Sequence, residues 1–108
     1  MKNLYLSPDP LSIRLKSTDI TSIKNVAQKI YGDALVWIFG SRADSSKKGG
    51  DIDIFIKSNH NQGLKDKLKF IGALQRLIGD RKIDLIVQTP NSRPRAIFKT
   101  AIDTGVRL

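Results

Sequence analysis

Apolar residues recur every three to four positions in two segments of the chain. This spacing places them on one side of an α-helix, so both segments are expected to be amphipathic helices. The first begins near Ser17 or Thr18, either of which can cap a helix, and ends at Gly32, while the second ends at Gly79. The apolar positions are Ile20, Ile23, Val26, Ala27 and Ile30 in the first segment, and Leu64, Leu68, Ile71, Leu74, Leu77 and Ile78 in the second.

Three other segments carry short runs of apolar residues that predict β-strands. Residues 34–39 form a continuous run of branched and aromatic side chains, which predicts a strand buried on both faces with Trp37 in the core. Residues 51–57 are rich in isoleucine, and residues 82–88 form the third run. The polar, glycine-containing stretch 40–50 therefore connects two neighbouring strands.

The ends of the chain are less regular. Residues 1–10 contain two prolines and are expected to be an extended lead-in, and the alternation at Leu11, Ile13 and Leu15 suggests a short strand or arm. Residues 95–103 predict a last helix and residues 106–108 an edge strand. The order helix, strand, strand, helix, strand, helix predicts an α+β fold, a small mixed sheet flanked by helices, in a single domain spanning 1–108.

The amino-acid composition indicates which kinds of partner and which cellular compartment to expect for this protein. The 108 residues include 19 Lys and Arg against 10 Asp and Glu, and this net charge of +9 would attract polyanions or simply keep the protein soluble. The absence of cysteine fits a reducing compartment, so the cytoplasm is expected. No segment approaches the roughly 18 consecutive apolar residues that a membrane-spanning helix needs, so no such helix is expected.

Three aspartates are the best candidates for chemistry. Asp51 and Asp53 are two residues apart on a predicted strand, so their side chains leave the same face and can converge on metal ions. Asp84 interrupts an apolar strand, which is a costly place for an unpaired charge. If a neighbouring strand brings Asp84 beside the pair, three buried acids would need cations to stay ionised, as in two-metal sites with ions about 3.5–4 Å apart.

A glycine-serine pair follows the first predicted strand. Gly40 allows close approach of the backbone to phosphate oxygens, and the Ser41 hydroxyl adds a hydrogen-bond donor. Arg42 can pair with a phosphate or lie along the end of the strand. Each feature alone is common, but a Gly-Ser pair followed by the two spaced aspartates and a third in a later strand is a specific combination.

This combination resembles the minimal nucleotidyltransferase (MNT) family of the DNA polymerase beta superfamily. The resemblance covers residues 20–108. It rests on the segments Phe39-Gly40-Ser41-Arg42-Ala43, Gly50-Asp51-Ile52-Asp53-Ile54 and Ile83-Asp84-Leu85-Ile86-Val87. The loop after Ala43 departs from many members, since Asp44-Ser45 replaces Arg-Gly, and this affects loop shape and nucleotide preference rather than the acids.

The resemblance implies a nucleotidyltransferase fold, two Mg²⁺ ions and ATP as substrate. It also implies a HEPN-domain toxin as partner, to which an MNT antitoxin adds AMP on a tyrosine. By position, Gly40, Ser41 and Arg42 would bind the nucleotide, Asp51 and Asp53 would hold both ions, and Asp84 would complete the catalytic and metal site.

A second hypothesis is a non-catalytic module. It would inhibit a HEPN-type ribonuclease by contact, or bind RNA through its basic surface. Arg93, Arg95 and Lys99 form a basic cluster near the last helix that would contact RNA, an acidic partner or only water. Since the chain is short, the acceptor surface is expected to come from another chain or from a homodimer.

Overall fold

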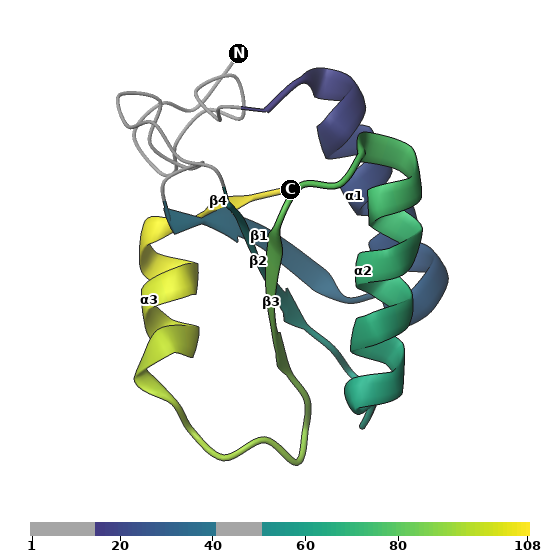
Figure 1. Cartoon of the computed structure of the whole chain (residues 1–108). Helices are drawn as coiled ribbons and strands as arrows, with labels where there is room; N and C mark the ends of the chain where they lie inside the picture. The colour runs from purple at the N-terminus through teal and green to yellow at the C-terminus, as the bar shows by residue number, and fades with distance from the viewer. Residues whose placement is uncertain (1–14, 41–50) are drawn as a thin grey trace.

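A four-stranded mixed sheet with helices on both faces organises the chain (Figure 1). The computed structural model describes residues 15–40 and 51–108. The first predicted helix, the strands and the later helices are all present among these residues. The elements are α1 (Ser17–Tyr31), β1 (Leu35–Phe39), β2 (Ile52–Lys57), α2 (Leu64–Ile78), β3 (Ile83–Gln88), α3 (Ala96–Thr104) and β4 (Val106–Arg107).

The sheet has the strand order β3-β2-β1-β4. β1 pairs antiparallel with β2 and with β4, whereas β2 and β3 are parallel and are connected through α2. A parallel pair needs a long crossover, and α2 supplies it. As a result, the first residues of β2, the first residues of β3 and the last residue of β1 lie at the same end of the sheet.

Two apolar clusters, one on each face, hold the layers together. On one face, the fully buried Ile52, Ile54 and Ile56 of β2 pack with residues of α1 and α2. On the other face, Phe55 packs between Trp37 and Phe98 of α3, with ring centroids 5.4 and 5.6 Å apart. The predicted burial of the first strand and of Trp37 is thus confirmed.

The predicted apolar stripe of α2 is only partly buried. Phe70 and Leu74 are fully buried, and Tyr31 of α1 lies against the Phe70 ring. Leu64, Leu68 and Leu77, however, are 60–67% exposed. Phe70 and Leu74 lie on the side of α2 that packs in the core. The three exposed leucines lie on other sides of the helix and remain in contact with solvent.

The start of α1 also differs from the prediction. Lys16, in extended conformation, is the N-cap, and no side chain caps the helix. Ser17 is the first helical residue, and its carbonyl accepts a hydrogen bond from the Thr21 hydroxyl. The predicted strand at Leu11 and Ile13 lies outside the described residues, but Leu15 packs against the core without forming a strand.

Gly105 sets the junction between α3 and β4. A Cβ atom there would lie 2.4 Å from the Ala101 carbonyl oxygen and 2.9 Å from that of Ile38. Gly105→Ala is therefore expected to lower the free energy of unfolding by about 1–3 kcal/mol, because backbone atoms must move. Gly72→Ala is the control: a Cβ there meets nothing within 4 Å in the middle of α2, so it should raise stability by about 0.5–1 kcal/mol. Urea denaturation would measure both; equal changes would contradict the packing argument.

Candidate active site

Two of the predicted acids meet at one end of the sheet. Asp53 on β2 and Asp84 on β3 are directly paired in the parallel register, on strands that lie about 4.8 Å apart. Asp51 precedes β2 by one residue. Asp53 is half-buried, whereas Asp84 is exposed and the Asp51 side chain is 44% exposed. The sequence-based expectation of three buried acids is therefore wrong, because the edge strand β3 leaves Asp84 open to solvent.

The electrostatics of this end of the sheet disfavour the charged form of Asp53. Burial of its carboxyl group raises the pKa of Asp53 most, and the negative charge of Asp84 raises it further. A hydrogen bond to Asp84, which the neutral form of Asp53 can donate, and the charge of Asp51 act in the same direction. Lys82 opposes them by lowering the pKa. Negative charge thus exceeds positive charge at this position, and a bound cation would relieve the repulsion.

Lys82 is a site neighbour that the sequence analysis did not single out. Its ammonium group lies 3.5 Å from the Asp51 carboxylate, but both side chains are exposed, so this ion pair contributes little stability. Its carbonyl oxygen accepts a hydrogen bond from the Ile52 amide at 2.9 Å. This bond ties the start of β2 to the residue before β3 and fixes the register that places Asp53 beside Asp84. The sequence could have indicated Lys82 as a neighbour of the site, because it lies two residues before Asp84 and alternate residues of a strand share a face.

Gly40 brings the end of β1 against the acids. Phe39 pairs with Asp53 across the antiparallel β1 and β2, and Gly40 follows with φ = +71°. A Cβ atom on residue 40 would lie 2.2 Å from Oδ2 of Asp53. Glycine is therefore required both for the backbone conformation and for the space that the carboxylate occupies. The predicted nucleotide ligands Ser41 and Arg42 lie outside the described residues.

The acids have the chemistry of Mg²⁺ ligands. Among residues 15–40 and 51–108, no group of three or more potential ligands is poised as a complete metal cage. Mg²⁺, however, is commonly held by one or two carboxylates together with substrate phosphates and water. Asp53 and Asp84 supply two adjacent hard oxygen donors with an unbalanced negative charge. The residues at this end of the sheet therefore fit Mg²⁺ bound together with a nucleotide.

Magnesium is expected to stabilise the protein through these acids. A Mg²⁺ concentration about tenfold above Kd contributes about 1.4 kcal/mol to folding, and each kcal/mol raises Tm by roughly 4–8 °C in a domain of this size. Calorimetry with and without Mg²⁺ would measure the shift. The increase should disappear in Asp53→Asn and persist in Asp33→Asn, an exposed aspartate between α1 and β1 at the opposite end of the sheet. An equal shift in both variants would place the ion elsewhere.

A small mixed sheet that presents paired aspartates beside a glycine at the end of a strand fits a site for a nucleotide bound with Mg²⁺. Residues 20–105 match the protein-family model described as a nucleotidyltransferase domain. The match spans most of the chain, and the chain therefore belongs to the nucleotidyltransferase domain family. The comparison with curated proteins gives no match. Membership confirms the predicted α+β nucleotidyltransferase fold and the general activity of nucleotidyl transfer, while assignment to the MNT family stays a prediction.

Three further features can be located among the described residues. No helix within the described residues is long and apolar enough to cross a membrane. His60 is exposed in the turn after β2, where its amide donates a hydrogen bond to the Ser58 hydroxyl. Tyr31, the last residue of α1, is buried and packs in the core.

Proposed function

We propose that this protein is a cytoplasmic, Mg²⁺-dependent enzyme of the MNT type that transfers AMP from ATP to a hydroxyl group of a partner protein. The proposed acceptor is a tyrosine of a HEPN-domain toxin, which the transfer would silence, so the chain would act as an antitoxin. The observation that carries the catalytic part is the in-register pairing of Asp53 and Asp84 at the end of the sheet where the absence of a side chain at Gly40 leaves room for the Asp53 carboxylate. The sequence resemblance to MNT proteins supports the choice of nucleotide and acceptor.

The proposed roles follow from position and exposure. Asp51 and Asp53 would hold the metal ions together with the triphosphate, and Asp84 would complete the set. Bound Mg²⁺ would neutralise triphosphate charge and make the acceptor hydroxyl more acidic. Asp84 is exposed and can accept the proton of an incoming hydroxyl group. Gly40, Ser41 and Arg42 would position the phosphates.

The bond changes of the proposed step are those of nucleotidyl transfer. The acceptor oxygen forms a bond to the α-phosphorus of ATP as its proton passes to the Asp84 carboxylate. The bond between the α-phosphorus and the oxygen that bridges to the β-phosphorus breaks, and pyrophosphate leaves with that bond's electron pair. Because Asp84 lies open to solvent on an edge strand, an acceptor on a separate molecule can reach it.

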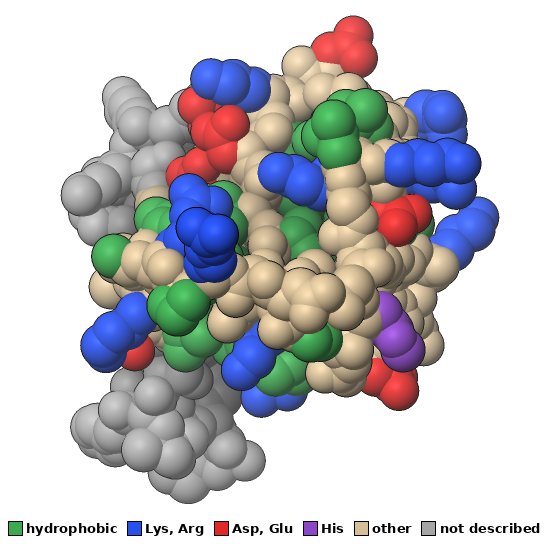
Figure 2. All heavy atoms as spheres, turned by 90° about the horizontal axis from the view of Figure 1, so that it is seen from below, with side chains coloured by type: hydrophobic (Ala, Val, Ile, Leu, Met, Phe, Trp, Pro, Cys, Tyr) green, Lys and Arg blue, Asp and Glu red, His purple; other side chains and the backbone are tan. Residues whose placement is uncertain are grey.

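The alternative is a module that binds without catalysis. It would hold a HEPN-type ribonuclease inactive by contact, or bind RNA. The net charge of +9 favours contact with a polyanion, and Figure 2 shows Lys and Arg side chains spread over one end of the molecule. The clustered acids favour catalysis, because adjacent carboxylates without a cation weaken binding to RNA and cost stability.

Two labels in ATP would test the proposed transfer. MNT proteins are often encoded beside their HEPN partner, so the product of the adjacent reading frame serves as the candidate acceptor. The protein is incubated with this acceptor, Mg²⁺ and ATP labelled at either the α- or the γ-phosphate. AMP transfer moves the α-label to the acceptor and leaves the γ-label in pyrophosphate. Acceptor labelled from γ-labelled ATP would indicate phosphoryl transfer, and no labelling together with a salt-sensitive RNA gel shift would favour the alternative.

A further inference from the structure

A second concave site lies on the acid-bearing face of the sheet, at the end away from the acids. It is a pocket of about 290 Å³ between the last residues of β2 and β3 and the helix α3. Lys57 and Gln88, which end the two strands, are paired in register and form one side. Side chains of α3 and the residue before it form the other side; they include Arg95, Phe98, Lys99 and Ile102.

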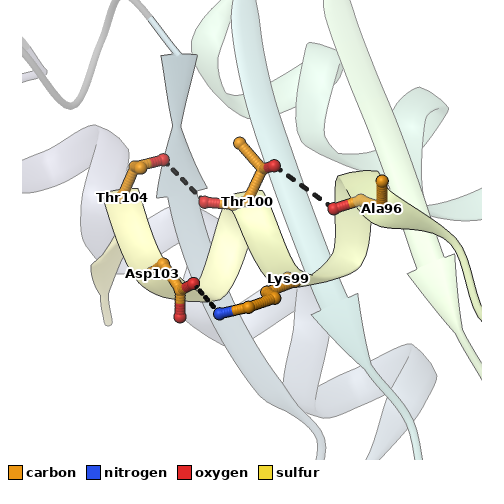
Figure 3. A network of polar contacts seen from close by, with 5 residues as sticks. All are labelled: Ala96, Lys99, Thr100, Asp103 and Thr104. Carbon is orange, nitrogen blue, oxygen red and sulfur yellow. Dashed lines mark hydrogen bonds and ion pairs between the residues drawn. The ribbon is translucent and has the colours of Figure 1, made fainter.

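The rim of this pocket is positively charged. Lys57 and Arg95 are exposed, and neither has an ion-pair partner among residues 15–40 and 51–108. Lys99 pairs with Asp103 one helical turn later, and Figure 3 shows the two side chains along α3. Among the described residues, three cations thus face a single carboxylate, and the rim carries a net positive charge that would attract an anionic ligand.

The exposed large apolar side chain of the pocket is aliphatic, whereas its aromatic residue is almost completely buried. Ile102 is 37% exposed, although it is a large apolar residue. Phe98 is only 6% exposed, and the Arg95 guanidinium lies 5.5 Å from the centre of its ring. Binding of single-stranded nucleic acid relies on exposed aromatic rings on which bases stack, and this pocket offers none. An exposed aliphatic side chain beside exposed cations instead matches a peptide in which acidic and aliphatic residues are neighbours.

We propose that this pocket, formed by Lys57, Gln88, Arg95, Lys99 and Ile102, binds an acidic segment of the partner protein that also carries an aliphatic side chain. Lys57 and Arg95 would bind carboxylates, and the partner's aliphatic side chain would cover Ile102.

The inference rests on the proposed function where it concerns the acceptor. Asp53 and Lys57 are four residues apart on β2, so their side chains leave the same face about 13 Å from each other. A partner segment held in the pocket therefore lies on the face that carries the reacting end. The pocket would anchor an acceptor chain whose hydroxyl group reaches Asp84.

Fluorescence anisotropy with a defined probe tests the pocket. The probe is a fluorescein-labelled eight-residue peptide of alternating Glu and Leu, added to the full-length protein without nucleotide. The double variant Lys57→Glu, Arg95→Glu is expected to weaken binding at least about tenfold, since two charge-assisted contacts are reversed. A peptide of alternating Glu and Ser should bind more weakly than the Glu-Leu probe to the wild-type protein.

The matched control reverses the same number of charges elsewhere. Lys69 and Arg76 lie on α2, beside a groove on the opposite face of the sheet. Lys69→Glu, Arg76→Glu should change binding of the probe less than about twofold, and circular dichroism should show both double variants folded. Equal loss in the two variants would overturn the proposal in favour of unspecific charge attraction. Tighter binding of a labelled oligouridine, lost only in the pocket variant, would overturn it in favour of an RNA site.

The pocket proposal and the proposed transfer activity can be tested independently of each other. Asp53→Asn should lower the rate of transfer by about 10²-fold or more but bind the Glu-Leu peptide like the wild-type protein. If the wild-type protein does not bind the peptide, the pocket proposal is wrong even where transfer is observed.

Discussion

Asp53→Asn is expected to lower the rate of nucleotidyl transfer by about 10²–10³-fold or more. Asparagine keeps the size of the side chain but removes the negative charge that would hold a metal ion and the triphosphate. Asp53 lies between Gly40 and Asp84 at the centre of the site, so no other described carboxylate can replace it. Transfer of the α-label from ATP to the acceptor, measured at saturating Mg²⁺, gives the rate.

Stability provides a second measurement for the same variant. Because burial, together with the charges of Asp84 and Asp51, raises the pKa of Asp53, removing its charge should leave the metal-free protein at least as stable as the wild type. Asp33→Asn serves as the control and should keep the wild-type rate. If Asp53→Asn is fully folded and transfers AMP at the rate of Asp33→Asn, the acids are not the catalytic site.

Gly40→Ala is expected to reduce transfer by roughly 10²-fold, because the added methyl group takes the position of the Asp53 carboxylate. The clash at 2.2 Å can be relieved only if Oδ2 of Asp53 moves or the backbone at the end of β1 shifts. The positive φ of residue 40 adds about 1–2 kcal/mol of strain. Both effects follow from the same substitution, so they must be separated.

Gly32→Ala separates backbone strain from displacement of the carboxylate. Gly32 has φ = +67° and terminates α1, but a Cβ atom there meets nothing within 4 Å. This variant should therefore lose a similar 1–2 kcal/mol of stability while retaining the wild-type rate of transfer. Denaturation and the label-transfer assay, applied to both variants, distinguish the two effects. Equal transfer rates in Gly40→Ala and Gly32→Ala would show that the contact with Asp53 has no part in the reaction.

Much of the fold was predictable because its signals are local. The periodic spacing in α1, the apolar run of β1 and the glycines after α1 and α2 predicted where these elements begin and end to within a residue or two. The fold class followed from the order of the elements, and the match to the nucleotidyltransferase domain family confirms it. The predicted N-cap of α1 was wrong, because a serine can either cap a helix or be its first residue. The sequence pattern does not distinguish the two positions.

Burial on the second face of β2 was not predictable from periodicity. Phe55 lies on the same face as Asp53, yet it is fully buried because Trp37 and Phe98 pack on either side of it. In α2 the opposite difference occurs. Leu64 and Leu68 have the spacing of buried residues, yet they are exposed. Whether an apolar residue is covered depends on which element packs there, and that is decided by contacts between distant parts of the chain.

The candidate site, too, was predictable from the sequence only in part. The sequence by itself determined which residues can hold a cation, since the charge of Asp51, Asp53 and Asp84 and the alternation along a strand are local properties. Only the tertiary structure decided that Asp84 stands beside Asp53, that it is exposed, and that Gly40 leaves room for the carboxylate. The physical reason is that strand pairing joins segments about thirty residues apart through backbone hydrogen bonds. The alternation within each strand decides which side chains share a face, but a register shift by an even number of residues keeps that face and would still separate Asp84 from Asp53.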